Sequence, residues 1–479
     1  MSISEQTAFL DATGQAELVR KGEVSAEELL DASIEGAEKL NPDLNFIVTR
    51  MYDEAKAAIQ AGLPDGPFTG VPFVLKDLGP QYAGVPTSAG SKLLANVVPE
   101  VDSALCKKYK QAGLVIFAKT LTPEFGFQPT TEPDLHGRCK NPWDTTRMAG
   151  GSSGGSGCAV AAGVVSMGHG NDGGGSIRIP ASCCGLFGLK PTRARISQAP
   201  MQGDSRSGLS NDHALTRSVR DSAALLDATE GAVLGDPYAA PPKERPFLDE
   251  VTTDPGRLRI AYNITAPNGK PIHDDCIQAT LDTVKLCEEL GHEVVEATAD
   301  YEGIEMSLAF VTMWECGARY GITAAAALLG REPREDDVEP LSWALYERGG
   351  NITGAQYLAA VNHIQKVSRI IAGFMQDYDV LLTPTLGEPP VPLGTFDAKP
   401  DNPIYGYYRA GKFGPFTAVY NMTGQPAMSV PLNWNSDGLP IGSHFVGRFG
   451  DEATLFRLAG QLESARPWAN RRPPINVLT

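Results

Sequence analysis

Short apolar runs alternate with amphipathic stretches in the first quarter of the chain. Residues 70–75 form an apolar run that is too brief for a helix and is bounded by glycine and proline, so it predicts a buried strand ending at Lys76. A helix is expected over residues 103–111, stopped by Gly113, and a second strand over residues 114–118. A strand, a helix and a strand in succession predict parallel strands covered by helices.

The N-terminal region, about residues 1–65, is expected to be helical and peripheral. Residues 25–28 read Ser-Ala-Glu-Glu, a capping-box pattern that predicts a helix continuing to about Leu40. Asn41 and Pro42 are expected to end it, because proline cannot continue a helix interior.

The alternation continues along the rest of the chain. The elements it predicts are strands at residues 186–190, 258–262, 292–296 and 378–384, helices at 274–290 and 452–463, a largely helical stretch at about 300–375 with breaks at Glu332-Pro333 and Gly349-Gly350, and a loop at 389–413. We expect the helical stretch to border the functional site. No internal repeat is found, and the proline-rich segment 237–246 is interpreted as a surface loop rather than an interdomain linker.

Two segments rich in glycine and serine stand out from this pattern. Residues 150–157 read GGSSGGSG, and residues 171–182 read NDGGGSIRIPAS. A flexible linker has similar composition but normally lies in polar surroundings. Here the first segment runs directly into residues 158–165, which are small and apolar and suit a tightly packed buried helix or strand. The glycines are therefore expected to belong to the core.

Composition and charge narrow the classes of protein. The 479 residues are 42% hydrophobic and 20% charged, which is ordinary for a globular protein with a sizeable core. The formal charge of −16 comes without any Lys/Arg-rich run, so a nucleic-acid partner is not expected. No signal peptide and no apolar run of membrane-spanning length is found, and the expected location is the cytoplasm.

The cysteines and histidines do not form recognisable metal motifs. Eight cysteines are scattered without a CxxC pair, which predicts buried thiols rather than a disulfide framework or a zinc site. None of the seven histidines forms an HExxH or similar close pair. We therefore expect no metal.

The second glycine-rich segment has the composition of an acyl-transfer site. Such chemistry requires a nucleophile, a base, and donors for the developing oxyanion. Ser176 is the preferred nucleophile, because the three glycines Gly173, Gly174 and Gly175 can direct successive N–H groups to one point. No GxSxG elbow and no Ser-His-Asp set surrounds Ser176.

Lys76 is the candidate base. At the end of an apolar strand it is placed to be desolvated, and burial lowers the pKa of a lysine and favours the neutral amine. The position of Lys76 in the sequence, taken alone, favours a simpler interpretation: a surface lysine, or one that forms a salt bridge with the adjacent Asp77.

Taken together, these segments resemble the amidase signature family of hydrolases. The resemblance rests on both glycine-rich segments and on the Lys76 strand, and it continues in the ordered segments KTLTPEFG (119–126), NPW (141–143), GLFGLKPT (185–192) and MTGQPAMSVPLNWNSDGLPIG (422–442). It implies one α/β domain over residues 1–479, with a large mixed sheet covered by helices on both faces and the core motifs at about 66–200.

The resemblance also implies a Ser-Ser-Lys triad. Lys76 matches the base, Ser152 the bridging serine that follows a cis peptide bond, and Ser176 the nucleophile that forms an acyl-enzyme. The oxyanion donors implied are the amides of Gly173, Gly174, Gly175 and Ser176. No cofactor is implied.

Four further positions receive supporting roles from the resemblance. Ser153, Asp172 and Arg178 are expected to brace the site, and Gly126 matches a place where backbone meets substrate. His169 is interpreted as a hydrogen-bonded core residue rather than a base.

Two positions depart from the family pattern. Gly173 stands where members commonly carry a bulkier residue, and His444 stands where many members carry a glutamine. The change at His444 is expected to affect packing or pocket lining and to leave the triad intact.

Within the family, the sequence resembles bacterial hydrolases of cyclic aminohexanoate dimers (nylon oligomers) and related broad amidases. The shared features are HGND before the glycines, TTEPD (130–134), SVRD (218–221) and EDDVE (335–339). The expected function is hydrolysis of small linear, cyclic or aryl amides, with a small-molecule partner and a possible homodimer.

Three alternatives remain at this point. One is the glutamine-amidase subunit of an amidotransferase, and another is an esterase or carbamate hydrolase of the same family. A nucleotide-binding loop is disfavoured because the glycines are not followed by the lysine of GxxxxGK[ST].

Overall fold

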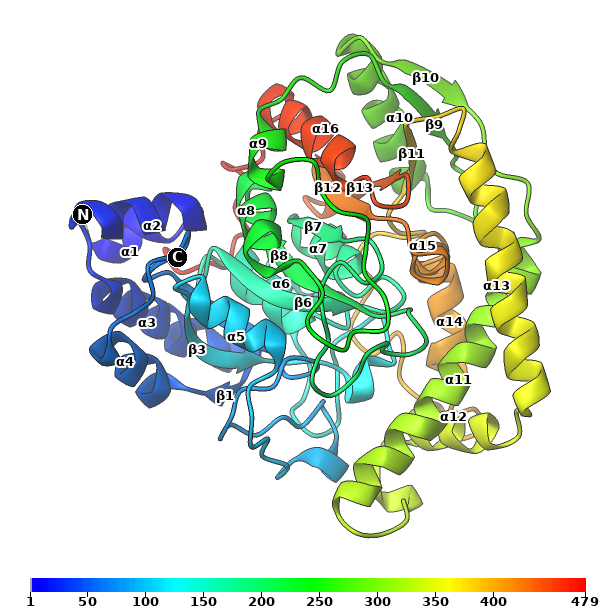
Figure 1. The fold of residues 1–479 in the computed structure, drawn as a ribbon, viewed down its shortest axis with the longest axis horizontal. Coiled ribbons are helices and arrows are strands. Elements are labelled where there is room, and N and C mark those ends of the chain that lie inside the picture. The colour runs from blue at the N-terminus through cyan, green and yellow to red at the C-terminus, as the bar shows by residue number, and fades with distance from the viewer. Residues whose placement is uncertain (1) are drawn as a thin grey trace.

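A twisted mixed sheet runs through the molecule in the computed structural model, which describes residues 2–479 (Figure 1). In that part of the chain the main sheet has eleven strands, in the order β1 (Ile47–Arg50), β3 (Val115–Thr120), β2 (Pro72–Lys76), β6 (Met167–Asp172), β8 (Asn211–Thr216), β7 (Phe187–Lys190), β12 (Ala427–Trp434), β13 (Pro440–Gly447), β11 (Val380–Pro384), β9 (Arg259–Tyr262) and β10 (Glu293–Glu296). A small hairpin pairs β4 (Lys140–Asn141) with β5 (Asp144–Met148). The α/β class expected from the sequence is confirmed.

Helices cover the sheet on both faces. Helices α5 (Ala104–Gln111), α8 (Val219–Thr229) and α16 (Glu452–Ala465) contribute to one apolar cluster, and α3 (Ala26–Leu44), α6 (Gly154–Ala161) and α7 (Arg178–Cys184) to another on the opposite side. The remaining helices are α1 (Ile3–Thr7), α2 (Ala12–Lys21), α4 (Tyr52–Ala61), α9 (Phe247–Val251), α10 (Asp274–Glu289), α11 (Gly303–Leu328), α12 (Pro340–Gly350), α13 (Gly354–Phe374), α14 (Tyr405–Phe413) and α15 (Ala418–Thr423), with 3₁₀ turns η1 (Lys92–Leu94), η2 (Glu124–Gly126) and η3 (Glu335–Asp337).

The strand predicted before Lys76 is present as β2 and is buried throughout. It pairs in parallel with β3, and α5 makes the connection, as the pattern predicted. Successive side chains enter opposite clusters: Phe73 and Leu75 lie in one, and Val74 in the other. Lys76 therefore follows Val74 onto the face covered by α6.

The small apolar stretch that follows GGSSGGSG begins as a helix. Helix α6 starts within the glycine-rich segment at Gly154 and ends at Ala161, so it takes in the first half of the apolar stretch; it is buried throughout and contacts β2, β6 and β8. Glycine, serine and alanine on this helix allow its backbone to approach the sheet closely. The sequence left helix and strand open here, and the structure selects the helix.

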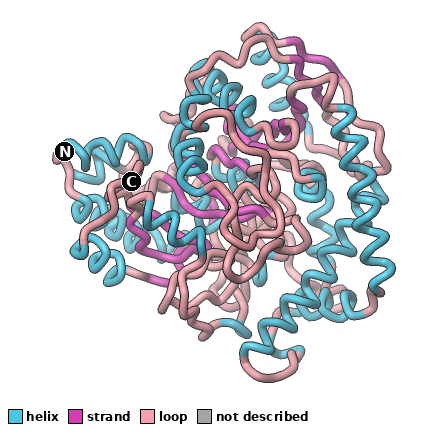
Figure 2. Tube along the Cα trace, viewed as in Figure 1, coloured by secondary structure: helices cyan, strands magenta, loops and turns pink. Residues whose placement is uncertain are grey.

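The long helical stretch consists of α11, α12 and α13, which stand together at one side of the molecule (Figure 1). The breaks fall at the predicted places, after α11 near Glu332-Pro333 and at the end of α12 near Gly349-Gly350. Figure 2 shows loops rather than helices filling much of the centre of the view, between the sheet and these helices.

Two predicted boundaries are wrong. Helix α3 continues past Asn41 and Pro42 to Leu44. The Asn41 side chain accepts N–H bonds from Phe46 and Ile47 just beyond the helix, which stabilises the turn containing the proline.

The second wrong boundary lies in the predicted loop 389–413, which contains α14 from Tyr405 to Phe413. Gly406 does not break this helix. A Cβ at that position would lie 2.0 Å from the carbonyl oxygen of Phe396, so the glycine permits close packing.

None of the helices in residues 2–479 has the length and apolar character needed to cross a membrane. All eight cysteines in this part of the chain are unpaired, and seven are buried, as their apolar surroundings predicted.

A substitution tests the close packing of α6. A Cβ on Gly155 would lie 2.5 Å from the backbone nitrogen of Leu121, where no flexible side chain can move aside. We expect Gly155→Ala to lower the free energy of unfolding by about 1–3 kcal/mol, measured by urea denaturation. Gly373→Ala, with open space around the new methyl group, is the control and is expected to be neutral or stabilising. Equal effects of the two substitutions would contradict the packing argument.

Candidate active site

Lys76 lies at the centre of the site, at the carboxyl end of β2. Its side chain is completely buried, and its amine donates to two neutral oxygens, Ser152 Oγ at 2.7 Å and Asn171 Oδ1 at 2.6 Å. Burial, together with the positive charge of Arg206, lowers the pKa of Lys76 well below its ordinary value, although Asp212 and Asp172 act in the opposite direction. The amine thus has the environment that favours its neutral form.

Asp77 does not pair with Lys76. Its carboxylate accepts the backbone N–H and the hydroxyl of Ser88 and lies 3.9 Å from the amine of Lys119. The simpler interpretation of Lys76, as a surface residue or a partner of Asp77, is therefore wrong.

Ser152 and Ser153 lie just before α6, on the face of the sheet that Lys76 reaches. The peptide bond between Gly151 and Ser152 is cis, as the family resemblance implied. Ser153 Oγ donates to the carbonyl oxygen of Asn171 at 3.3 Å and so ties this segment to the end of β6.

The backbone of Gly126 lies close to the side chain of Ser152. Its φ is +68°, and a Cβ there would lie 3.0 Å from Ser152 Oγ and 2.7 Å from the side chain of Leu78. A glycine is required both by this backbone conformation and by the close approach.

Ser176 follows β6 in the glycine-rich turn before α7, and the side chain borders open cavity space while the residue is only 7% exposed. Within residues 2–479, the N–H groups of Gly173, Gly174 and Ser176 have no hydrogen-bond partner. The N–H of Gly175 instead donates to Asp172 Oδ1 at 2.7 Å. This differs from the sequence-based expectation, which counted Gly175 among the oxyanion donors.

Asp172 and Arg178 form a completely buried ion pair beneath this turn, with 2.9 Å between Oδ1 and Nη2. Arg178 also donates to Asn421 Oδ1, and Asn421 Nδ2 donates to Asp172 Oδ1. Burial alone would raise the pKa of Asp172, but the Arg178 charge and these hydrogen bonds hold it well below its ordinary range. The carboxylate stays ionised and fixes the turn through Gly175 and Ile177.

His169 is a buried structural residue, as expected. Its Nδ1 accepts the backbone N–H of Lys76, so Nε2 carries the proton and donates to Asp212 Oδ1 at 3.1 Å. Burial lowers the pKa of His169, which keeps the ring neutral. Both ring nitrogens are occupied, and neither is free to act as a base.

His444 contributes to the same buried framework. Its Nε2 lies 3.1 Å from Arg178 Nη1, which can only donate, and its Nδ1 lies 3.0 Å from the hydroxyl of Thr383. Burial lowers the pKa of His444 well below its ordinary value. His444 therefore belongs to the buried packing behind the turn.

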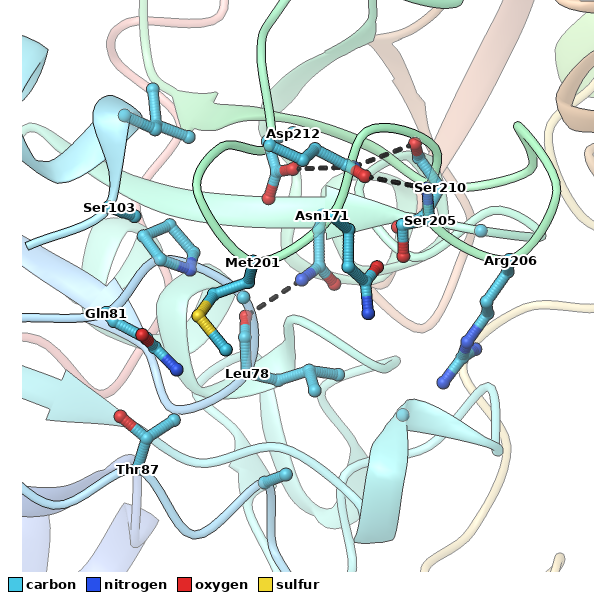
Figure 3. A pocket seen from close by; sticks show the side chains of 18 of the residues that line it. Leu78, Gln81, Thr87, Ser103, Asn171, Met201, Ser205, Arg206, Ser210 and Asp212 are labelled. Carbon is cyan, nitrogen blue, oxygen red and sulfur yellow. Dashed lines mark hydrogen bonds between the residues drawn. The ribbon is translucent and has the colours of Figure 1, made fainter. Parts of the chain in front are cut away.

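Two cavities meet at Ser176, Gly126 and Trp314. The first, about 290 Å³, is called the polar cavity because its wall carries the polar side chains of Ser152, Asn171, Gln81, Gln198, Ser205, Arg206 and Asp212, which stand among apolar ones such as Leu78, Leu94 and Leu328 (Figure 3). The second, about 240 Å³, has a largely apolar wall that includes Phe127, Ile179, Phe310, Val311, Tyr407, Val419 and Met422. The nucleophile candidate thus lies between two chemically different compartments.

Comparison with known proteins agrees with this geometry. The family model described as Amidase matches residues 28–456. The chain is 37% identical to the 6-aminohexanoate-cyclic-dimer hydrolase of a Pseudomonas species (strain NK87), over 99% of this chain and 98% of that protein. The chain belongs to the amidase family.

Solved structures place this amidase among the amidase signature enzymes. A 6-aminohexanoate cyclic dimer hydrolase complexed with substrate has a TM-score of 0.93 and 35% identity, with 98% of this chain and 99% of that chain covered. A bacterial aryl acylamidase of the amidase signature family has a TM-score of 0.87 and 26% identity, covering 96% and 97%. Members of this family hydrolyse amide bonds, and the chain is such a hydrolase.

Several site residues of the amidase were not found from the sequence. Asn171 begins the second glycine-rich segment, but only the fold directs its side chain to the Lys76 amine. Asn421 and Thr417 come from α15 and the residue before it, more than 200 positions away, and donate to Asp172 and to the carbonyl oxygen of Gly174. Arg206 reaches the cavity from the segment between β7 and β8, and Asp212 reaches it from β8 itself. No local signal marks these positions.

The buried ion pair gives a stability prediction. Asp172→Asn leaves the Arg178 charge without its partner, and we expect the free energy of unfolding to fall by about 3–5 kcal/mol, measured by urea denaturation near neutral pH. Asp282→Asn removes one partner of an exposed pair with Lys285 and is expected to change it by less than about 1 kcal/mol. A loss at Asp172 no larger than at Asp282 would contradict the prediction.

Proposed function

We propose that this amidase hydrolyses small carboxylic amides through a Ser-Ser-Lys triad and an acyl-enzyme on Ser176. The observation that carries the proposal is that the Lys76 amine is completely buried and hydrogen-bonded to Ser152 Oγ. No carboxylate in residues 2–479 lies within ion-pair distance of this amine. A neutral amine in that position can accept a proton, which an ordinary lysine at neutral pH cannot.

Acylation follows from the proposed roles. Ser176 Oγ attacks the amide carbon while its proton passes to Ser152 Oγ, and the Ser152 proton passes to Lys76 Nζ. The carbonyl π electrons move onto oxygen, and the unpartnered N–H groups of Gly173, Gly174 and Ser176 are the donors available for that oxyanion.

Collapse of the tetrahedral intermediate completes the step. The carbon–nitrogen bond breaks as a proton returns from Lys76 through Ser152 to the departing nitrogen, which leaves as an amine. Water then attacks the ester on Ser176 by the same relay, and the acid is released with Ser176 restored.

The two cavities supply an orientation for the substrate. Ser152 and Asn171 line only the polar cavity, so a nitrogen that takes its proton from Ser152 lies on that side. The amine portion of the substrate then occupies the polar cavity and the acyl portion the apolar one. Volumes of about 290 and 240 Å³ suit small molecules.

The similarity to 6-aminohexanoate-cyclic-dimer hydrolases supports cyclic amides among the substrates.

Serine substitutions test the triad. With a panel of small amides, mass spectrometry is expected to find the acyl group on the peptide containing Ser176. Ser176→Ala is expected to abolish this adduct and to lower kcat by at least about 1,000-fold, while Ser152→Ala lowers kcat by about 100- to 10,000-fold through loss of proton relay. Ser166→Ala, at a buried serine that lines neither cavity, is the control. Turnover at the wild-type rate by Ser176→Ala would refute the proposal.

The pH dependence of kcat/KM tests Lys76 as the base. Because the neutral amine is the active form, activity is expected to rise with pH through the lowered Lys76 pKa and to fall below it. Arg206→Met removes a cation that lowers this pKa, so the acid limb of the pH profile of kcat/KM is expected to move to higher pH. Asp212→Asn removes an anion that raises this pKa, so the same limb is expected to move to lower pH. Acid limbs that coincide with the wild-type limb in both variants would contradict the assignment.

A further inference from the structure

Arg206 carries a positive charge that the protein does not neutralise. In residues 2–479, no carboxylate lies within 4.0 Å of its guanidinium, and its only hydrogen bond runs from Nη2 to the carbonyl oxygen of Phe125. Burial lowers the pKa of Arg206 to about 10, so the group stays charged at neutral pH. A partly buried charge without a counter-ion is costly unless a ligand provides one.

Aromatic rings hold the guanidinium in place. Its central carbon lies 4.5 Å from the ring centre of Trp314 and 5.2 Å from that of Phe127. Stacking on ring faces leaves the N–H groups at the edge of the guanidinium plane available for hydrogen bonds. The arginine is therefore fixed in position and still has donors to offer.

The guanidinium lies beside the reacting centre. Arg206 lines the polar cavity together with Ser152 and Ser176, and a Cβ built on Gly173 would be 3.8 Å from Arg206 Nη1. It does not line the apolar cavity. Its donors therefore face the compartment assigned above to the amine portion of the substrate.

We propose that Arg206 binds a carboxylate on the amine portion of the substrate, so that N-acyl amino acids are the preferred linear substrates. This inference rests on the proposed function, and it adds a specificity-determining residue to it. The planar guanidinium matches a carboxylate in a two-point hydrogen-bonded pair, which a neutral group cannot form. Hydrolysis then releases a carboxylic acid from the apolar side and an amino acid from the polar side.

The acidic residue of the same cavity does not oppose this arrangement. Asp212 accepts hydrogen bonds from His169 Nε2 and Gln198 Nε2, and both of its oxygens are engaged. Figure 3 shows Asp212 and Arg206 on different sides of the cavity. A carboxylate can therefore approach Arg206 without facing a free anionic oxygen.

A matched pair of substrates tests the inference. N-butanoyl ω-amino acids of increasing chain length are compared with the N-butanoyl ω-amino alcohols, which share the amide and lack the charge. In the wild type we expect a higher kcat/KM for the acid at the chain length that reaches Arg206. Arg206→Met is expected to lower kcat/KM for that acid by about 10- to 100-fold more than for the alcohol, the effect of losing hydrogen bonds to a charged group.

The ratio of the two substrates within each variant is the decisive quantity. A change in the Lys76 pKa alters both reactions alike and cancels in this ratio. Arg206→Lys is expected to restore part of the preference because it keeps the charge without the planar fork. Arg319→Met is the control, since Arg319 also stacks on a ring, that of Tyr346, and lines neither cavity. Equal losses for acid and alcohol in Arg206→Met would overturn the inference.

Binding measurements separate this inference from the proposed function. The Ser176→Ala protein is titrated calorimetrically with the same N-butanoyl ω-amino acid and alcohol, with and without Arg206→Met. We expect the acid to bind at least about tenfold more weakly without Arg206, and the difference to shrink at high salt. Equal affinity for acid and alcohol in the presence of Arg206 overturns carboxylate recognition even if the triad is correct. A charge-dependent difference supports it even if catalysis proceeds by another route.

Discussion

The site depends on a lysine whose amine is shielded from water and has no carboxylate partner. Lys76 is completely buried at the end of β2, and its amine contacts a serine hydroxyl and an asparagine amide instead of a carboxylate. These partners satisfy its hydrogen bonds while leaving the charged form unfavourable. The surrounding architecture provides these two contacts, because the segment just before α6 brings Ser152 to the amine and β6 brings Asn171.

The turn that holds Ser176 is stabilised by the opposite arrangement, a charge that is fully paired. Asp172 and Arg178 are buried together, and Asn421 and the Gly175 amide complete the bonds of the carboxylate. The protein thus buries one basic side chain, Lys76, without an acidic partner and another, Arg178, within an ion pair. Since Asp172 engages the Gly175 amide, the amides of Gly173, Gly174 and Ser176 are the ones left without a partner in residues 2–479.

Arg206 connects catalysis and specificity. Its charge contributes to lowering the pKa of Lys76, and its free donors face the polar cavity. A bound carboxylate would partly neutralise the charge of Arg206. Binding of an anionic substrate would therefore raise the pKa of Lys76 slightly. The apolar cavity on the other side of Ser176 contains no such group, which gives the two halves of an amide different surroundings.

The sequence alone determined the α/β class, the strand that ends at Lys76 and the presence of two glycine-rich segments in the core. These follow from the spacing of apolar residues and of glycines along the chain, which is a local property. Through family resemblance it also indicated the triad residues and the cis bond at Ser152. It placed the end of α3 too early and missed α14, since both depended on contacts that compensate for proline and glycine. Only the tertiary structure decided that Asn171 rather than Asp77 contacts Lys76, that Gly175 donates to Asp172, and that Arg206 faces the cavity without an acidic partner. Each of these depends on contacts between segments that the fold brings together or on the direction of one side chain, neither of which composition or periodicity encodes.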